Sequence, residues 1–360
     1  MATVMDYISQ GSRIFLSGWK SRMFPKHYSG TAEEIGHKII RDCWNGRFFQ
    51  TSTTNFPQFW TRDFGWCVQS LLKLGYNKEV QQTLRYAMNR FRKYKQVTTT
   101  LTPGGKAFNF PVEAVDSLPW FIHALRIAKF PYYDFKDFLN LQIKNYFEEI
   151  VDRNTGLVRS DKYFSSIKDF ALRRSSCYDN CMVALLASDL DKMKLYNPLV
   201  NYNYPELISK NFWNGSYFYD DLERKRYVSG DANVFPFLLG VITDVEMLQL
   251  AIKSIQKAEL DQPFPLKYTS NREHSRFIWQ EMFLKNYESD SIWMHIGPLY
   301  VRMVKEVDQT LAQYYKERYR KLILLHKNFM EVFAANGNPF KTKFYHSDSG
   351  MLWVANYLTL

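Results

Sequence analysis

The sequence predicts an all-α protein built as an (α/α)6 barrel of six helical hairpins. Helical periodicity recurs in nearly every segment, while the alternation typical of strands is scarce. The predicted helices also alternate in character, because every second one is apolar nearly all round and those between carry charge on one side. Six buried helices inside six amphipathic ones describe this barrel. The alternative is an open α-solenoid, which would show a clearer repeat.

The chain divides into a short lead-in and one long helical domain. We expect residues 1–30 to be an N-terminal lead-in segment and 31–360 to be a single (α/α)6-barrel domain, because no linker rich in Pro, Gly or Ser separates two parts. The helices are expected to pair as consecutive hairpins. Their expected ranges are 32–47, 62–75, 77–94, 116–129, 134–150, 177–194, 202–213, 231–241, 243–258, 290–304, 305–334 and 348–358.

The two kinds of helix place the active site at one end of the barrel. Segments 33–41 and 134–144 are typical of surface helices, whereas 234–242 and 292–301 are apolar enough to be buried on most sides. The connections that precede the apolar helices are long and rich in polar and aromatic residues. In a barrel of hairpins these connections meet at the end where the inner helices start. Function concentrates on such loops, and helix N-termini add backbone donors.

Composition excludes several classes of protein. Apolar residues make up 46% and aromatic residues 17% of the chain, which argues against disorder and for an aromatic-lined interior or cleft. The net charge is +11, but Lys and Arg are spread along the chain, so nucleic-acid binding is not predicted. No apolar run is long enough to span a bilayer, and residues 1–26 lack a signal-peptide pattern. We therefore expect a cytoplasmic protein without membrane contact.

Cysteine and histidine give no sign of a metal or cofactor. The seven His residues do not pair at metal-ligand spacing, so we predict no metal and no cofactor. Free buried thiols, in keeping with the cytoplasm, are expected at Cys43, Cys67, Cys177 and Cys181.

Acids and aromatic residues dominate the expected active end. No Ser/His/Asp set and no Gly-rich phosphate loop is present in the sequence. Asp116 stands between a Gly/Pro loop and an apolar helix, where a carboxylate is a good N-cap. An aromatic-lined pocket with two carboxyl groups suits glycoside hydrolysis, in which one protonates the leaving oxygen and the other activates water or attacks directly.

Four segments resemble motifs of the six-hairpin glycoside hydrolases, in the same order as in that family. This family includes glucoamylases, the amylo-1,6-glucosidase domain of glycogen debranching enzymes, processing α-glucosidase-type enzymes and alkaline invertases. The segments resemble the Arg-Asp motif that grips the sugar, the segment with the general acid, a Trp-x-x-x-Gly-Pro segment and the segment with the general base. They are residues 60–66, 115–121, 291–298 and 331–339.

The resemblance implies an inverting, exo-acting hydrolase for an α-linked glucoside or small oligosaccharide, with Asp116 as general acid and Glu331 as general base. The two carboxyl groups would then stand about 6.5–9.5 Å apart. Glu113, one turn earlier, is the rival acid. Expected substrate contacts are Arg62, Asp63, Trp60, Trp120, Tyr178, Asp231, Trp293 and His346. The chain has Ala335-Asn-Gly337 after the base segment, where debranching enzymes often have Asp-Gly, which leaves the substrate open.

Structural interpretations of the same residues stand beside the catalytic one. Arg62 and Asp63 could be an ion pair at a helix start, and Asp231 an ordinary N-cap. Trp120 and Trp293 could belong to the core, and Glu331 could be a solvated helix end. The alternative function is therefore a non-catalytic carbohydrate-binding protein on the same barrel. In both cases the partner is a carbohydrate.

Overall fold

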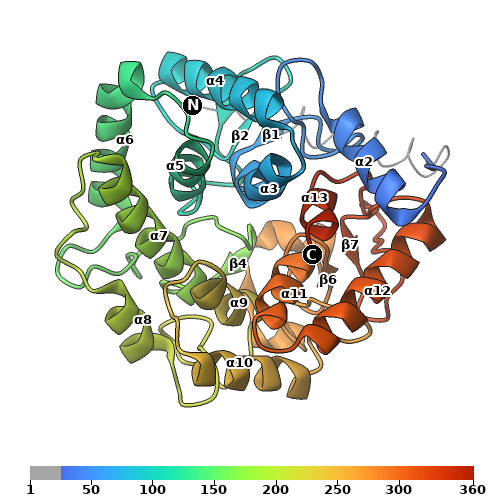
Figure 1. Cartoon of the computed structure of the whole chain (residues 1–360). Helices are drawn as coiled ribbons and strands as arrows, with labels where there is room; N and C mark the ends of the chain where they lie inside the picture. Colours follow the sequence, from blue (N-terminus) through green and yellow to red (C-terminus); the bar gives the residue numbers. More distant parts are fainter. Residues whose placement is uncertain (1–25) are drawn as a thin grey trace.

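The computed structural model describes residues 26–360, which form two concentric rings of α-helices (Figure 1). The inner ring contains α3 (Thr61–Lys73), α5 (Ser117–Ile127), α7 (Cys177–Met193), α9 (Gly230–Leu238), α11 (Gly297–Lys305) and α13 (Val354–Leu358). The outer ring contains α2 (Ala32–Cys43), α4 (Asn77–Tyr94), α6 (Lys136–Ile150), α8 (Tyr204–Phe212), α10 (Val245–Lys257) and α12 (Gln309–His326).

The ring is closed. Each inner helix packs against the next one along the chain, and the last, α13, packs against α3 and α2 at the beginning. Each outer helix after α2 packs against the inner helix that precedes it. The (α/α)6 barrel predicted from the sequence is therefore confirmed, and the open solenoid is not.

The burial pattern explains which helices lie inside. Helix α4 buries a single stripe, formed by Val80, Leu84, Ala87, Met88 and Phe91, with the spacing of one helix face. Helix α7 is instead buried on nearly every side from Cys177 to Leu186. An apolar helix of this kind is stable only where other helices surround it.

Two kinds of connection alternate around the barrel. Those from an inner helix to the next outer helix are short, and those from an outer helix to the next inner helix are long. Short antiparallel strands tie the long connections to one another: β1 (Phe59–Trp60), β2 (Thr100–Leu101) and β3 (Ala107–Phe108) form one sheet, β4 (Ala171–Leu172) pairs with β5 (Arg276–Phe277), and β6 (Ile292–Trp293) pairs with β7 (Val332–Phe333). The same connections contain the 3-10 turns η2 (Arg272–His274) and η3 (Trp279–Leu284), while η1 (Tyr133–Phe135) precedes α6.

Three expected helices are much shorter than the sequence suggested. The helix expected over 290–304 begins only at Gly297, because Ile292–Trp293 is recruited into β6 and Pro298 fits the first helical turn. The helix expected over 305–334 comprises only Gln309–His326, since Lys327 closes it in a left-handed conformation and β7 follows. The last helix begins at Val354 rather than 348.

The start of the described chain lies against its end. The backbone N–H of Tyr28 donates to the carbonyl of Lys327 at 2.8 Å, beside the C-terminus of α12. Most of the lead-in expected over 1–30 lies outside the described residues. All four cysteines are buried and free, as predicted. Within residues 26–360, none of the helices has the length and apolar character needed to span a membrane.

Candidate active site

A cavity of about 440 Å³ opens at the end where the inner helices begin. All the long connections except the one before α9 contribute to its wall, and most of the side chains that they supply are aromatic or aliphatic. Four carboxylic acids reach the cavity, namely Asp63, Asp169, Glu288 and Glu331. The end predicted from the pattern of connections therefore contains an aromatic-lined cavity with several carboxyl groups.

Arg62 organises one part of this cavity. It lies in the first turn of α3 and donates from Nη1 to Oδ2 of Asp116 at 3.2 Å and from Nη2 to Oδ1 of Asp169 at 3.1 Å. The side chain of Asp169 is 21% exposed and lines the cavity, whereas that of Asp116 is fully buried. Arg62 thus joins a carboxylate at the cavity surface to another behind it.

Asp116 occupies the N-cap position of α5, but its side chain does not cap the helix. Its Oδ2 accepts hydrogen bonds from Arg62 and from the hydroxyl of Tyr178 at 3.0 Å, and its Oδ1 has no partner among the described residues. Burial raises the pKa of Asp116, while the Arg62 charge opposes the rise. In this conformation Asp116 stands one side chain behind the cavity surface.

Glu331 lies at the sixth connection, directly before β7, and is 1% exposed. Its Oε1 accepts from the hydroxyl of Tyr287, and its Oε2 accepts from the hydroxyl of Tyr345 at 2.5 Å and from the N–H of Asp348 at 2.8 Å. Burial and the nearby Asp348 raise the pKa of Glu331 to about 7, although the tyrosine hydroxyls oppose the rise. These donors fix the orientation of the carboxyl group and favour its ionised form.

Glu288 holds the segment that presents Asp169. Its carboxylate accepts the backbone N–H groups of Asp169 at 2.6 Å, Phe170 at 2.7 Å and Ala171 at 3.2 Å. Burial and the charge of Asp169 raise the pKa of Glu288 to about 8. The structure adds Asp169 and Glu288 to the carboxyl groups considered from sequence. Their only sequence signal is that both lie in long connections before inner helices.

Asp63 and several rings form the inner part of the cavity. Burial raises the pKa of Asp63 to about 7 against the effect of Arg62, and its Oδ1 accepts from the indole N–H of Trp353 at 3.0 Å. Trp66 stacks on His295 with centroids 4.4 Å apart and planes at 6°. Burial and the Arg62 charge lower the pKa of His295, which keeps its imidazole neutral. Flat faces beside hydrogen-bonding groups suit a sugar ring.

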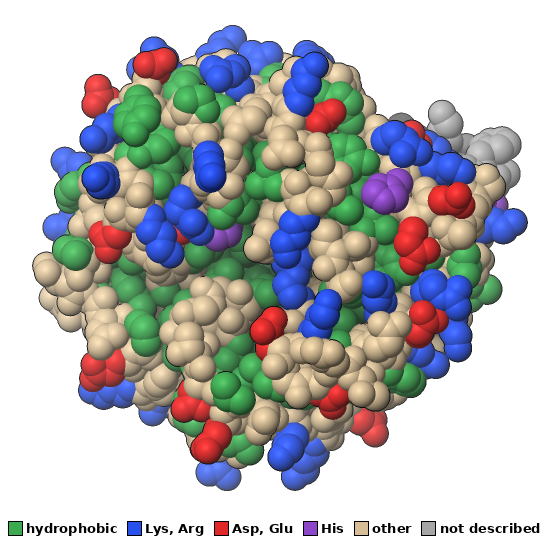
Figure 2. Space-filling view, viewed as in Figure 1, with side chains coloured by type: hydrophobic (Ala, Val, Ile, Leu, Met, Phe, Trp, Pro, Cys, Tyr) green, Lys and Arg blue, Asp and Glu red, His purple; other side chains and the backbone are tan. Residues whose placement is uncertain are grey.

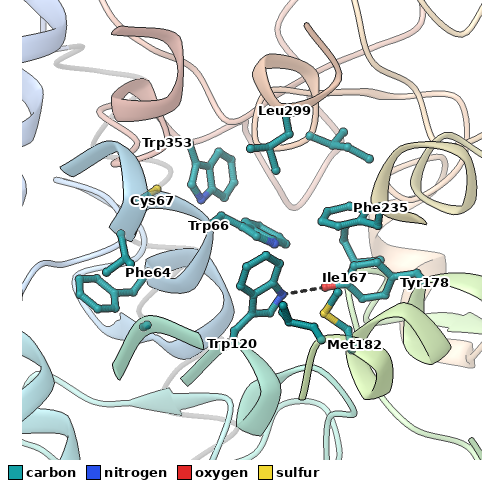
Figure 3. Close-up of a cluster of buried hydrophobic side chains, with 14 of the residues drawn as sticks. Phe64, Trp66, Cys67, Trp120, Ile167, Tyr178, Met182, Phe235, Leu299 and Trp353 are labelled. Carbon is teal, nitrogen blue, oxygen red and sulfur yellow. Dashed lines mark hydrogen bonds between the residues drawn. The ribbon is translucent and has the colours of Figure 1, made fainter. Parts of the chain in front are cut away.

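The predicted site residues fall into three groups. The cavity brings together Arg62, Asp63, Trp60, Trp293 and Glu331. Trp120 and Tyr178 instead belong to the buried layer beneath it, where the indole N–H of Trp120 donates to the Tyr178 hydroxyl at 3.2 Å (Figure 3). Figure 3 also shows Trp66 and Trp353 in this layer, with Trp66 beside Trp120. Tyr178 reaches the cavity indirectly, through Asp116 and Arg62.

The three other residues considered from sequence lie away from the cavity wall. Asp231 is fully buried between Lys168 Nζ at 2.9 Å and Arg173 Nη1 at 2.7 Å, and Ser229 rather than Asp231 holds the N-cap position of α9. Because Asp231 is paired with these two cations, its function in this conformation is structural. His346 is partly buried in the sixth connection, and Glu113 is exposed and borders a different depression.

The fold resembles solved glycosidase structures at low sequence identity. A rhamnosidase from Klebsiella oxytoca with rhamnose bound superposes with a TM-score of 0.65 at 9% identity, over 93% of this chain and 65% of the rhamnosidase. A GH63 mannosylglycerate hydrolase from Thermus thermophilus, solved with Tris and D-glycerate, gives 0.58 at 10% identity over 91% and 100%. A bacterial glucoamylase complexed with acarbose gives 0.63 at 12% identity over 90% and 54%.

These likenesses show the fold that the sequence motifs implied. The chain spans only part of the rhamnosidase and the glucoamylase, but the full length of the mannosylglycerate hydrolase. The sequence itself matches no protein-family model and no curated protein sequence.

Proposed function

We propose that this chain is a glycoside hydrolase that inverts the configuration of the anomeric carbon, with Glu331 as general base. The observation that carries the proposal is the placement of Glu331. It lies in the connection before α13, while the two carboxylates held by Arg62, those of Asp116 and Asp169, lie on the connections before α5 and α7. Helices α7 and α13 stand on opposite sides of the inner ring (Figure 1). This arrangement suits acid and base acting on opposite faces of a sugar.

The proposed reaction needs only water as co-reactant. The acid gives its proton to the glycosidic oxygen as the bond from that oxygen to the anomeric carbon breaks. A water molecule attacks the opposite face of the carbon and passes a proton to Glu331. The products are a free sugar of inverted configuration and an alcohol, and the protons return through solvent.

Two residues compete for the acid. The sequence motif favours Asp116, whereas the cavity favours Asp169, because its carboxyl group is the exposed member of the pair that Arg62 joins. We assign proton donation to Asp169 and a positioning function to Asp116, which acts through Arg62. Burial raises the pKa of the neighbouring Glu288 to about 8, so Glu288 is protonated near neutrality.

The substrate contacts follow from the remaining polar groups. Arg62 and Asp63 lie at the cavity wall, where they would bind sugar hydroxyls by charge-assisted hydrogen bonds, and Trp66, Trp293 and Trp353 offer faces for stacking. An α-linked glucoside or small oligosaccharide is the class implied by the sequence motifs. A cytoplasmic location remains part of this proposal and is in keeping with the free thiols.

The test is a time-resolved proton NMR assay against maltose, isomaltose, trehalose, maltotriose, sucrose, glucosylglycerate and mannosylglycerate. We expect one compound to release its sugar first as the inverted anomer. Asp169→Asn should then abolish turnover more completely than Asp116→Asn, and the reverse order would return the acid function to Asp116. Binding of a sugar without any turnover would instead favour a non-catalytic carbohydrate-binding protein.

A further inference from the structure

We propose that the substrate carries an apolar aglycone, alkyl or aryl, which lies along an aromatic ridge at the mouth of the cavity. This inference rests on the proposed glycosidase function and specifies its substrate class. We define the aromatic ridge as Trp279, Met282, Phe283 and Phe344.

The aromatic ridge is an exposed apolar surface that adjoins the cavity. Trp279 is 67%, Met282 69%, Phe283 44% and Phe344 47% exposed. The rings form a chain, with centroids 6.1 Å apart from Trp279 to Phe283 and 5.5 Å apart from Phe283 to Phe344. Phe283 and Phe344 also line the cavity itself, so the ridge continues from the cavity wall to the surface. Large exposed side chains that adjoin one another mark a binding surface more often than isolated ones do.

Polar contacts hold this ridge in place. Glu281, in the middle of η3, is 1% exposed and accepts from both terminal nitrogens of Arg272, with 2.5 Å between Nη2 and Oε2. The hydroxyl of Thr342 donates to the carbonyl of Phe283 at 3.2 Å and so ties the Phe344 loop to η3. The apolar side chains are therefore displayed by an anchored segment.

The ridge is also fixed relative to the proposed acid. The N–H of Ile278 donates to the carbonyl of Phe170 at 2.9 Å, one residue beyond Asp169, and β5 pairs with β4 just after it. A leaving group protonated by Asp169 would thus emerge beside the segment that begins the ridge.

The charged groups that line the cavity are not part of the aromatic ridge. They are concentrated around Arg62, Glu288 and Glu331, where a sugar ring would find hydrogen-bond partners. Another part of the cavity wall is aromatic: Trp60 contacts Phe56 and Phe110 edge-on at 6.1 and 6.0 Å, and Phe110 contacts Phe170 at 6.4 Å. An alkyl or aryl group would bury apolar surface favourably against these rings.

The experiment tests hydrolysis of the glycosidic bond and preference for an aglycone in separate steps. Wild-type protein is first tested on α-glucosyl, α-mannosyl and α-rhamnosyl fluorides, which have no aglycone to bind. The methyl glycoside, the octyl glycoside below its micelle concentration and a disaccharide are then compared, all carrying the sugar that was accepted. We expect kcat/KM for the octyl compound to exceed that for the methyl compound and the disaccharide by at least tenfold.

Variants locate the effect on the ridge. Trp279→Ala and Phe344→Ala should each reduce the octyl-to-methyl ratio of kcat/KM at least threefold. Tyr133→Ala, which removes a ring that is 76% exposed in η1, should leave that ratio unchanged.

Each result bears on the proposal. Equal rates for octyl and methyl compounds, or preference for the disaccharide, would overturn the apolar aglycone while the glycosidase function stands, because the fluoride is still hydrolysed. A Trp279→Ala variant that changes the sedimentation of the protein but not the ratio would make the ridge a self-association surface. No hydrolysis of any fluoride would count against the proposed function and remove the inference with it.

Discussion

The two ends of the barrel contain cavities of similar size and different chemistry. The end with the long connections encloses about 440 Å³, and the opposite end, between the C-termini of the inner helices, encloses about 550 Å³. Figure 2 views this second end and shows a central hollow with apolar side chains inside and Lys, Arg and His around it. Trp66 borders both cavities, so one layer of rings separates them.

Asp189, Arg126 and Arg302 at the second end have local partners. Asp189 accepts from Arg126 Nε at 2.5 Å and from His123 Nδ1 at 2.8 Å. Arg302 donates to Gln69 at 3.1 Å and to Ser70 at 3.0 Å, both neutral. At the first end, by contrast, burial raises the pKa values of Asp63, Glu288 and Glu331 to between about 7 and about 8. Cavity volume therefore does not distinguish the two ends, whereas the raised pKa values of these carboxyl groups do.

The largest expected difference between the ends is in catalysis. Glu331→Gln should lower kcat by about 10³-fold, because the base that accepts the water proton is lost while the shape is kept. Asp189→Asn, at the second end, should leave kcat within twofold. Steady-state kinetics on the substrate found by NMR measures both. Comparable losses in the two variants would remove the distinction between the ends.

Removal of an arginine should also affect the two ends unequally. Arg62→Met leaves Asp116 buried without its cation and should cost about 3–5 kcal/mol of unfolding free energy, as well as activity. Arg302→Met loses hydrogen bonds to neutral groups and should cost about 1–2 kcal/mol. Denaturant unfolding monitored by circular dichroism measures both values. A larger loss for Arg302→Met would contradict this ranking.

The pH profile provides a smaller contrast. The general base must be ionised and the general acid protonated, so kcat/KM should rise about tenfold per pH unit up to the Glu331 pKa of about 7 and fall again at the higher pH where the acid loses its proton. Tyr345→Phe removes a donor that lowers this pKa and should move the rising limb to higher pH. Asp189→Asn should not move it. If the rising limb lies at the same pH in the wild type, Tyr345→Phe and Asp189→Asn, Glu331 is not the group whose ionisation controls the rate.

The smallest effect concerns stability against pH. Because the pKa of Glu288 is raised in the folded state, its neutral form stabilises the protein at low pH, and this stabilisation is lost as pH rises through about 8. We expect the Tm of the wild type to fall from pH 5 to 9, and that of Glu288→Gln to fall less, by about 2 °C or more. Parallel curves of Tm against pH for the two proteins would show that Glu288 does not contribute to the pH dependence of stability.

The sequence predicted the framework better than the site. Apolar helices alternating with amphipathic ones were sufficient for the barrel, because helix burial follows periodicity. The helices expected over 290–304 and 305–334 were too long, since β6 and β7 form only through pairing between connections distant in sequence. For the same reason Asp169 carries no local signal, as its importance comes from Arg62 and Glu288, which are remote along the chain.

Asp116 shows what a sequence motif cannot predict, namely the contacts of the side chain. Its place before an apolar helix correctly predicted an N-cap position, but the side chain makes no capping bond. The carboxylate is instead engaged by Arg62 and Tyr178, which no local pattern announces. Whether it donates a proton or positions Arg62 is decided by the Asp116→Asn and Asp169→Asn variants.

The closure of the ring by α13 has a consequence for how the protein is made. The cavity takes residues from Thr51 to Trp353, and α13 can reach its neighbours α3 and α2 only after residues 354–358 have been synthesised. A nascent chain on the ribosome therefore has no closed ring until α13 has emerged. A chain stopped before Val354 should have no activity.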